Sequence, residues 1–183
     1  MNQDQLQALL TKVQQGALAV PDALHRLRTL PYENLGFASL DHHRALRQGF
    51  PEVIFCEGKT VSQVVAIAKT LLRKNNALLA TRVEPSVARA LLRVSKRAVY
   101  HEAARVVAIA PPKLVRRGAV LIVTAGTADI PVAEEARVTA DIMGSKTDTL
   151  YDVGVAGLHR LLGQQERLHD ARALIVVAGM DGV

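Results

Sequence analysis

Residues 119–136 read AVLIVTAGTADIPVAEEA, and this stretch decides the fold. Residues 119–124 form a continuous apolar run that ends in a threonine, which is typical of a strand buried on both faces of a parallel sheet. Gly126 then allows a tight turn, and Pro131 favours the first turn of a helix that ends near Met143. A strand, a short loop and a helix in this order indicate one half of a βαβ unit.

The same order of elements recurs towards the end of the chain. We expect a weaker strand over 148–153, a helix from Leu158 and a further strand over 173–178. Strands that alternate with helices predict an α/β fold with a doubly wound parallel sheet, like that of flavodoxin. Residue 183 comes soon after the last strand, so we expect this sheet to be incomplete on its C-terminal side.

Upstream of this sheet, the pattern predicts a small α/β region. The pentapeptide VVAIA occurs twice, and we interpret residues 64–68 as helix, because the helical pattern continues to Lys74, and 106–110 as strand, because Pro111 ends it. The expected strands cover 52–56, 77–81 and 104–110, and the expected helices cover 61–74, with Thr60 as its N-cap, and 84–94.

A helical arm is expected at the start of the chain. The spacing of apolar residues predicts helices over 2–14 and 20–29, and a polar linker follows over 31–51. The expected organisation is an arm and linker over 1–50, the small α/β region over 51–117 and a nucleotide-binding domain over 118–183.

The composition excludes several classes of protein. Of the 183 residues 49% are hydrophobic and only 3% aromatic, so the core must be aliphatic. Cys56 is the single cysteine and lies in an expected strand, so it is interpreted as a small buried hydrophobe in a reducing compartment, with no intrachain disulfide. We see no signal peptide and no apolar stretch of membrane-spanning length, and therefore expect a cytoplasmic protein without a membrane partner.

The positive charge is concentrated in one segment. The formal net charge is +6, and residues 85–117 hold eight basic residues against one acid, Glu102. This segment either binds phosphates or nucleic acid, or is a solvated helix face with basic loops. Tyr100 is the only aromatic residue among these charges, which argues against base stacking and against a nucleic-acid partner. The basic residues are Arg89, Arg93, Lys96, Arg97, Arg105, Lys113, Arg116 and Arg117.

The turn after the strand at 119–124 is the first candidate for chemistry. Gly126 lets the backbone approach a ligand, the Thr127 hydroxyl can donate to a phosphate oxygen, and Asp129 can accept from ribose hydroxyls. The helix after this turn offers free N–H groups to a phosphate. The alternative is an ordinary turn with a hydroxyl cap.

A second strand-end turn reads GVAGLHR over 154–160. His159 is a candidate acid, base or phosphate donor, and Arg160 is a candidate phosphate clamp. The alternative is a histidine at a helix start beside an exposed arginine. Because the carboxyl ends of parallel strands meet at one edge of a sheet, we expect both turns to converge on a sugar-phosphate.

Two other patterns carry less weight. Asp41, His42 and His43 are adjacent, and neighbouring side chains point apart, so we expect no metal site there. Residues 58–60 read GKT like the tail of a P-loop, but Val53 stands where that motif requires its first glycine. An NTPase is excluded on that ground.

Four segments are similar to the nickel-pincer cofactor biosynthesis family LarB. They are LDHHRALRQGFPEVIFCEGKT at 40–60, VTAGTADIPVAEEA at 123–136, YDVGVAGLHRLL at 151–162 and AGMDGV at 178–183. The second half also resembles the aminoimidazole ribonucleotide carboxylases (PurE). Their Gly-Ser-x-Ser-Asp and Ala-His-Arg loops correspond to residues 126–129 and 158–160.

The resemblance implies a PurE-type fold and a carboxylation. The LarB family carboxylates the pyridinium ring of nicotinic acid adenine dinucleotide with carbon dioxide or bicarbonate, and hydrolyses the phosphoanhydride to release AMP. No firm cofactor is implied, a need for magnesium stays open, and a homo-oligomer is expected. The residues implied to bind the nucleotide are Gly126, Thr127, Asp129, His159 and Arg160, and Asp181 is implied to assist the chemistry.

The length of the chain departs from the family pattern. The nucleophilic cysteine of the family lies in a C-terminal portion beyond residue 183, and Cys56 does not match it. We therefore expect the chain as given to lack covalent catalysis. The alternatives are an aminoimidazole ribonucleotide carboxylase or mutase-like protein, and a non-catalytic, nucleotide-binding module that forms oligomers.

Overall fold

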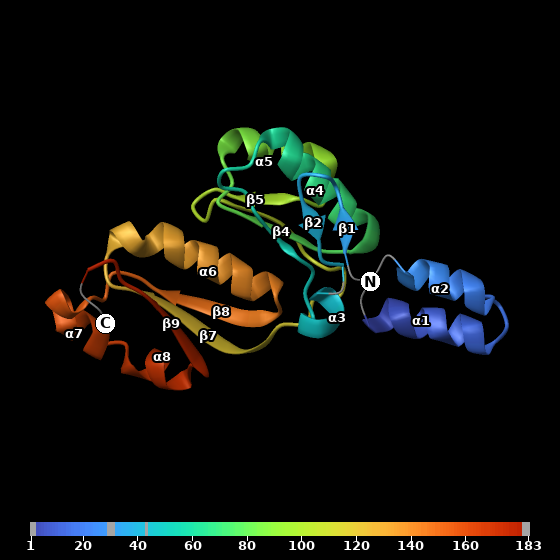
Figure 1. Cartoon of the computed structure of the whole chain (residues 1–183). Coiled ribbons are helices and arrows are strands. Elements are labelled where there is room, and N and C mark those ends of the chain that lie inside the picture. Colours follow the sequence, from blue (N-terminus) through green and yellow to red (C-terminus); the bar gives the residue numbers. More distant parts are fainter. Residues whose placement is uncertain (1–2, 29–31, 43, 181–183) are drawn as a thin grey trace.

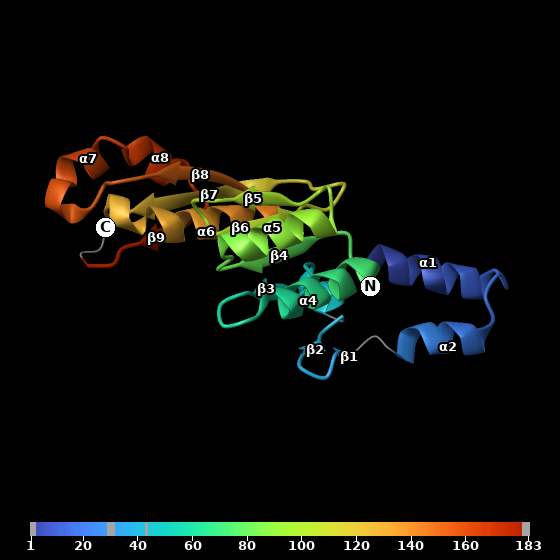
Figure 2. The same ribbon diagram turned by 90° about the horizontal axis from the view of Figure 1, so that it is seen from above.

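The computed structural model of the chain describes residues 3–28, 32–42 and 44–180. Two helices, α1 (Gln3–Gln14) and α2 (Val20–Arg28), form a hairpin that projects from one end of the molecule (Figures 1 and 2). Leu9 on α1 and Ala23 on α2 are buried. The two expected arm helices are therefore present, each within one residue of its expected bounds.

The first sheet has four strands in the order β3-β4-β6-β5. β3 and β4 are parallel, whereas β6 is antiparallel to both of its neighbours. The three expected strands are present, and β5 is a further strand that the pattern did not indicate. The four strands are β3 (Val53–Phe55), β4 (Leu78–Thr81), β5 (Val99–His101) and β6 (Val106–Ile109).

Two helices, α4 (Val61–Lys74) and α5 (Pro85–Val94), cover one face of this sheet. Thr60 begins α4 with a capping box, in which its hydroxyl accepts from Gln63 N at 3.2 Å and Gln63 Oε1 accepts from Thr60 N at 2.9 Å. The predicted N-cap is confirmed, and α4 has the bounds expected from the sequence.

The second sheet has three parallel strands in the order β8-β7-β9. β7 (Arg117–Thr124) lies in the middle, between β8 (Ser145–Leu150) and β9 (Ala173–Val177). Residues 121–124 at the end of β7 are buried, as expected of an apolar central strand. The α/β fold with a flavodoxin-like parallel sheet is therefore confirmed.

Helix α6 (Ile130–Ile142) lies between the two sheets (Figure 1). Its Val138 and Ile142 pack in one cluster with Leu79 and Ala108 of the first sheet. The opposite side of α6 packs on the second sheet. The two regions expected over 51–117 and 118–183 thus share one helix, and the boundary between them stays a prediction.

Two short helices, α7 (Leu158–Leu162) and α8 (Gln165–Asp170), cover the far face of the second sheet. Gly163 separates them, so the single helix expected from Leu158 is divided in two. The layers run from α4 and α5 through the first sheet, α6 and the second sheet to α7 and α8 (Figure 1).

The strand expected over 148–153 is displaced, because β8 begins at Ser145 and ends at Leu150. β8 is an edge strand of the sheet and exposes Lys146 and Asp148 while the residues that alternate with them are partly buried. Its sequence SKTDTL is therefore mostly polar and lacks a long apolar run. The stretch after it, from Tyr151, turns instead of continuing the strand.

The expected polar linker over 31–51 contains structure of its own. A hairpin of β1 (Glu33–Asn34) and β2 (Ser39–Leu40) is followed by a short helix, α3 (Arg44–Gln48). Leu40 is buried in the cluster that α4 and α5 form with the first sheet. In the part of the chain that the structure describes, no helix is long and apolar enough to cross a membrane.

Candidate functional site

The turn after β7 is closed by a carboxylate. Gly126 is extended, a 3-10 turn, η1 (Thr127–Asp129), comes next, and Asp129 leads directly into α6. Asp129 Oδ2 accepts a hydrogen bond from Gly126 N at 3.0 Å. This hydrogen bond holds the first candidate turn closed at the carboxyl end of β7, with the N-terminus of α6 beside it.

The turn after β8 lies directly against the turn after β7. Val153 N donates to Thr124 O at 3.0 Å, and Gly154 N donates to Ala125 O at 2.9 Å. A Cβ atom at Gly154 would stand 2.7 Å from Ala125 O, so only glycine permits this approach. The two candidate turns are thus fused at one edge of the sheet.

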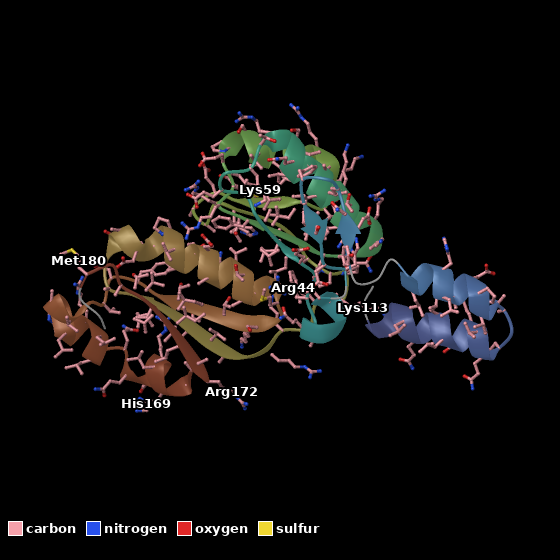
Figure 3. All side chains as sticks on the ribbon, in the orientation of Figure 1. Arg44, Lys59, Lys113, His169, Arg172 and Met180 are labelled. Atoms are coloured by element: carbon pink, nitrogen blue, oxygen red, sulfur yellow. The ribbon has the colours of Figure 1, made fainter. Side chains whose placement is uncertain are left out.

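The end of β9 joins them through the same carboxylate. Asp129 Oδ1 accepts from Gly179 N at 3.1 Å. Asp129 therefore links the β7 turn to the residue that precedes Met180, whose side chain is 95% exposed (Figure 3). All three strands of the second sheet contribute to this edge.

Arg160 stands at the same edge and pairs with Asp152. The backbone of Asp152 has a φ of 60°, and its N–H donates to Thr124 Oγ1 at 3.0 Å. Sequence reasoning missed Asp152, because an aspartate after a strand gives no signal of a left-handed backbone or of an arginine partner.

A partly buried network of hydrogen bonds joins α6 to this edge. Glu134 accepts two hydrogen bonds from Arg137, each 2.8 Å long, and a third from Tyr151 OH. The Arg137 guanidinium, together with the Tyr151 hydroxyl, holds the pKa of Glu134 below its usual value despite partial burial. Burial and the Glu134 carboxylate raise the pKa of Tyr151. Neither Glu134 nor Tyr151 was a candidate from the sequence.

The remaining residues expected at the site are Thr127, His159 and Asp181. Thr127 and His159 are exposed and make no side-chain hydrogen bond with other described residues. Asp181 lies outside the described residues. The structure thus brings the Gly126, Thr127 and Asp129 turn against the turn that leads to Arg160, while the ligand roles of these residues stay predictions.

A cavity of about 220 Å³ opens beside the amino-terminal halves of β7 and β8, at the other end of the strands. Two of its charged groups already pair, since Arg167 Nη2 lies 2.7 Å from Asp148 Oδ2. We place the candidate site at the strand-end turns and not in this cavity, because ligands of open α/β sheets bind at the carboxyl ends of the strands.

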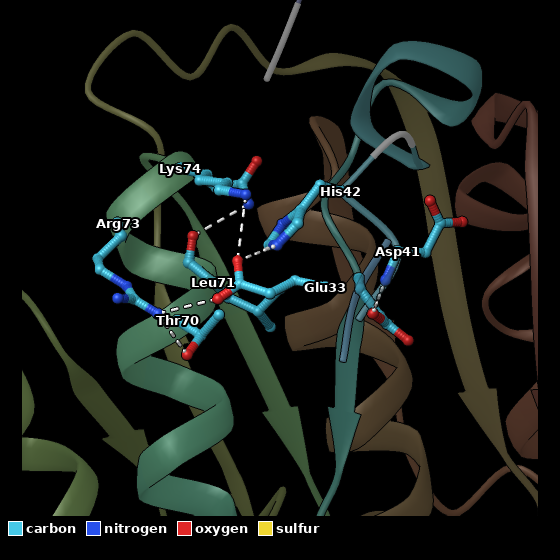
Figure 4. Close-up of polar contacts among 9 residues, drawn as sticks. Glu33, Asp41, His42, Thr70, Leu71, Arg73 and Lys74 are labelled. Atoms are coloured by element: carbon cyan, nitrogen blue, oxygen red, sulfur yellow. Dashed lines mark hydrogen bonds and ion pairs between the residues drawn. The ribbon is translucent and has the colours of Figure 1, made fainter. Parts of the chain in front are cut away.

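His42 pairs with a carboxylate. Its ring is buried, and Nε2 lies 3.0 Å from Glu33 Oε2, which also receives Lys74 Nζ at 3.1 Å (Figure 4). Burial lowers the pKa of His42, more than the Glu33 carboxylate raises it. His43 lies outside the described residues. Among the side chains that the structure describes, no three His, Cys, Asp or Glu gather closely enough to hold a metal ion.

The remaining patterns belong to the first sheet. Lys59 Nζ donates to Phe55 O at 2.7 Å and lies on the first-sheet side of the molecule (Figure 3). Cys56 is 4% exposed, and burial raises the pKa of its thiol to about 11. The interpretation of Cys56 as a buried hydrophobe is confirmed, since so high a pKa leaves little thiolate near neutral pH.

Comparison with known proteins points to one group. A family model described as the LarB/PurE-like N-terminal domain matches residues 32–111. The chain is also 34% identical over 188 aligned residues to MJ0165, an uncharacterized protein of Methanocaldococcus jannaschii. That alignment covers 97% of this chain and 73% of MJ0165. The similarity therefore extends over both sheets and includes the strand-end turns.

Proposed function

Since the chain belongs to the LarB/PurE family, whose members are carboxylase- or mutase-like, we propose that it is the nucleotide-binding part of a LarB-type carboxylase. The proposed substrate is nicotinic acid adenine dinucleotide. In the proposed reaction a pyridinium ring carbon gains a bond to the carbon of carbon dioxide and loses its proton. Water cleaves the phosphoanhydride, and AMP leaves.

One observation carries this proposal. The turns after β7 and β8 leave the same edge of the second sheet and are joined by hydrogen bonds of 2.9 and 3.0 Å. A sugar-phosphate needs donors for the phosphate and acceptors for the ribose within a few ångströms of each other. The fused turns offer a hydroxyl at Thr127, a guanidinium at Arg160 and a carboxylate at Asp129 along that edge.

We assign the phosphate to the start of α6 and to Arg160. The N-terminus of α6 presents backbone N–H groups and a positive dipole end, which favour an anion. The Thr127 hydroxyl donates to the same phosphate, and the Arg160 guanidinium offers a two-pronged contact. His159, exposed on α7, adds a further donor when protonated.

The ribose is assigned to Asp129. Two backbone N–H groups already occupy part of this carboxylate, one on each oxygen. A carboxylate has about four acceptor positions, so each oxygen retains room for a ribose hydroxyl. Asp181, two residues after Gly179, is proposed to help move the ring proton.

The covalent step is not assigned to Cys56. Ring activation in the LarB family uses a cysteine nucleophile, and only a thiolate is reactive enough for that addition. Cys56 is buried beside the first sheet with a pKa of about 11. We therefore propose that residues 1–183 bind the nucleotide without carboxylating it.

Isothermal titration calorimetry of the 183-residue protein tests the proposal. Nicotinic acid adenine dinucleotide and nicotinic acid mononucleotide should both bind, and Arg160→Ala should weaken each by roughly tenfold or more. Arg167→Ala is the matched control, because Arg167 pairs with Asp148 of β8 and contacts neither of the strand-end turns through a hydrogen bond or ion pair in the described residues. Tighter binding of aminoimidazole ribonucleotide would favour a PurE-like function, and no heat with any of the three would refute nucleotide binding.

A further inference from the structure

We infer that Glu134 and Tyr151 are positioning residues that fix the Arg160 guanidinium at the candidate site through Asp152. The ligand-dependent part of this inference rests on the proposed function. Neither residue is expected to touch the nucleotide, since both act from the α6 side of the β8 turn.

The first link runs from α6 to the end of β8. The Glu134 carboxylate is 17% exposed and is oriented by Arg137, which holds both of its oxygens at 2.8 Å. A carboxylate held in this way is a fixed acceptor, because rotation would break two charged hydrogen bonds. The Tyr151 hydroxyl donates to this fixed acceptor. The first residue after β8 is therefore tied to α6.

The second link is the backbone between Tyr151 and Asp152. A φ of 60° at Asp152 is a left-handed conformation that residues with a side chain rarely adopt. Asp152 N donates to the hydroxyl of Thr124, which is fully buried. The phenol on one side and this N–H on the other hold the unusual backbone in place.

The third link is the ion pair at the surface. Asp152 Oδ2 accepts from Arg160 Nη1. The guanidinium also lies over Gly157, where an added Cβ would stand 2.4 Å from Arg160 Nε. An arginine that is 42% exposed would otherwise sample many rotamers, so these contacts define its position before a ligand arrives.

A purely structural role for Glu134 makes a different prediction. If the Glu134–Tyr151 bond only held α6 against β8, its loss would lower stability and leave the Arg160 side chain unchanged. Positioning requires that the Arg160 side chain responds to the loss of one oxygen atom on Tyr151, although no hydrogen bond joins these two side chains in the described structure.

The ligand-free test observes the Arg160 side chain by nitrogen-proton NMR. In the wild type we expect a resolved Arg160 Nε–H signal whose proton exchanges slowly with water. In Tyr151→Phe and in Glu134→Ala, we expect the chemical shift and the exchange rate of this signal to move to those of a free arginine side chain. Tyr100→Phe and Glu135→Ala are the matched controls, because the Tyr100 hydroxyl has no hydrogen bond within the described residues and Glu135 pairs with Arg82. An Arg160 signal that is the same in Tyr151→Phe and in the wild type overturns the inference.

The ligand test uses nicotinic acid mononucleotide and the riboside that lacks its phosphate. Tyr151→Phe should weaken binding of the mononucleotide by about three- to tenfold and leave binding of the riboside unchanged. When Arg160 is already replaced by alanine, Tyr151→Phe should cause no further loss of affinity for the mononucleotide. A loss that is equal for both ligands, or additive with Arg160→Ala, contradicts positioning. If the wild type binds neither ligand while its Arg160 signal still responds to Tyr151→Phe, the proposed function fails and the positioning stands.

Discussion

Gly154 is the residue at which the two turns of the candidate site come closest. An added Cβ would meet Ala125 O at 2.7 Å, and this backbone atom cannot rotate away. We expect Gly154→Ala to lower the free energy of unfolding by about 1–3 kcal/mol and to weaken nucleotide binding. Gly163→Ala is the control, because its nearest neighbour would be 3.5 Å away in ordinary contact. Equal urea midpoints for the two variants would show that the turns tolerate separation.

The single residue Glu134 makes the stability of the fold depend on pH. Its pKa is lower in the folded protein, chiefly because of the Arg137 hydrogen bonds, so the unfolded chain binds its proton more readily. This carboxylate therefore contributes stability above its unfolded pKa, near 4.5, and the contribution is lost as the pH falls through the lower folded value. Urea unfolding at several pH values should show a shallower acid loss for Glu134→Gln than for the wild type. Parallel curves would rule out this contribution.

Single residues at the carboxyl edge of the second sheet were predictable where a strand, a turn and a helix follow one another in the sequence, while their roles in binding stay predictions. The positions of Gly126 and Asp129 could be identified, because an apolar run followed by a turn and a helix marks the edge of a sheet in the amino-acid sequence itself. Asp152 could not, because its partners Thr124 and Arg160 lie elsewhere in the chain. Nor could the Glu134–Tyr151 contact, because it depends on how α6 packs against the end of β8. That contact joins side chains 17 positions apart in the chain.

At the scale of elements, α4 shows how local signals fix a helix. Thr60 and Gln63 satisfy each other's backbone N–H groups, so the start of α4 does not depend on distant packing. Thr60→Ala should lower the free energy of unfolding by about 1 kcal/mol, measured by urea titration. Thr60→Ser retains the acceptor and should stay close to the wild type. If both substitutions cost the same, the hydroxyl bond is not what stabilises α4.

Elements without such signals were placed less well. β8 alternates between exposed and partly buried residues at the edge of its sheet, and its polar sequence did not show where it begins. β5 has only three residues and depends on antiparallel pairing with β6, which a local pattern cannot encode. By contrast, the apolar runs of β4, β6 and β7 were identified because burial on both faces leaves a continuous signal.

At the scale of the whole molecule, α6 makes the two sheets dependent on each other. Ile142 is buried against the first sheet, while the helix also packs on the second. Ile142→Ala should therefore destabilise both sheets together by roughly 2–5 kcal/mol. Hydrogen exchange of the β4 and β7 amides should accelerate in parallel. Faster exchange confined to β4 would mean that the sheets unfold independently.

The shared helix also has a consequence for dissecting the protein. Residues 32–116 expressed alone would present Leu79 and Ala108 to water, and residues 117–183 alone would present Val138 and Ile142. Each fragment would then expose an apolar surface patch and tend to aggregate. Produced in the same cell, the two fragments should associate through α6 and stay in solution, which would make the junction between residues 116 and 117 a natural place for a split reporter.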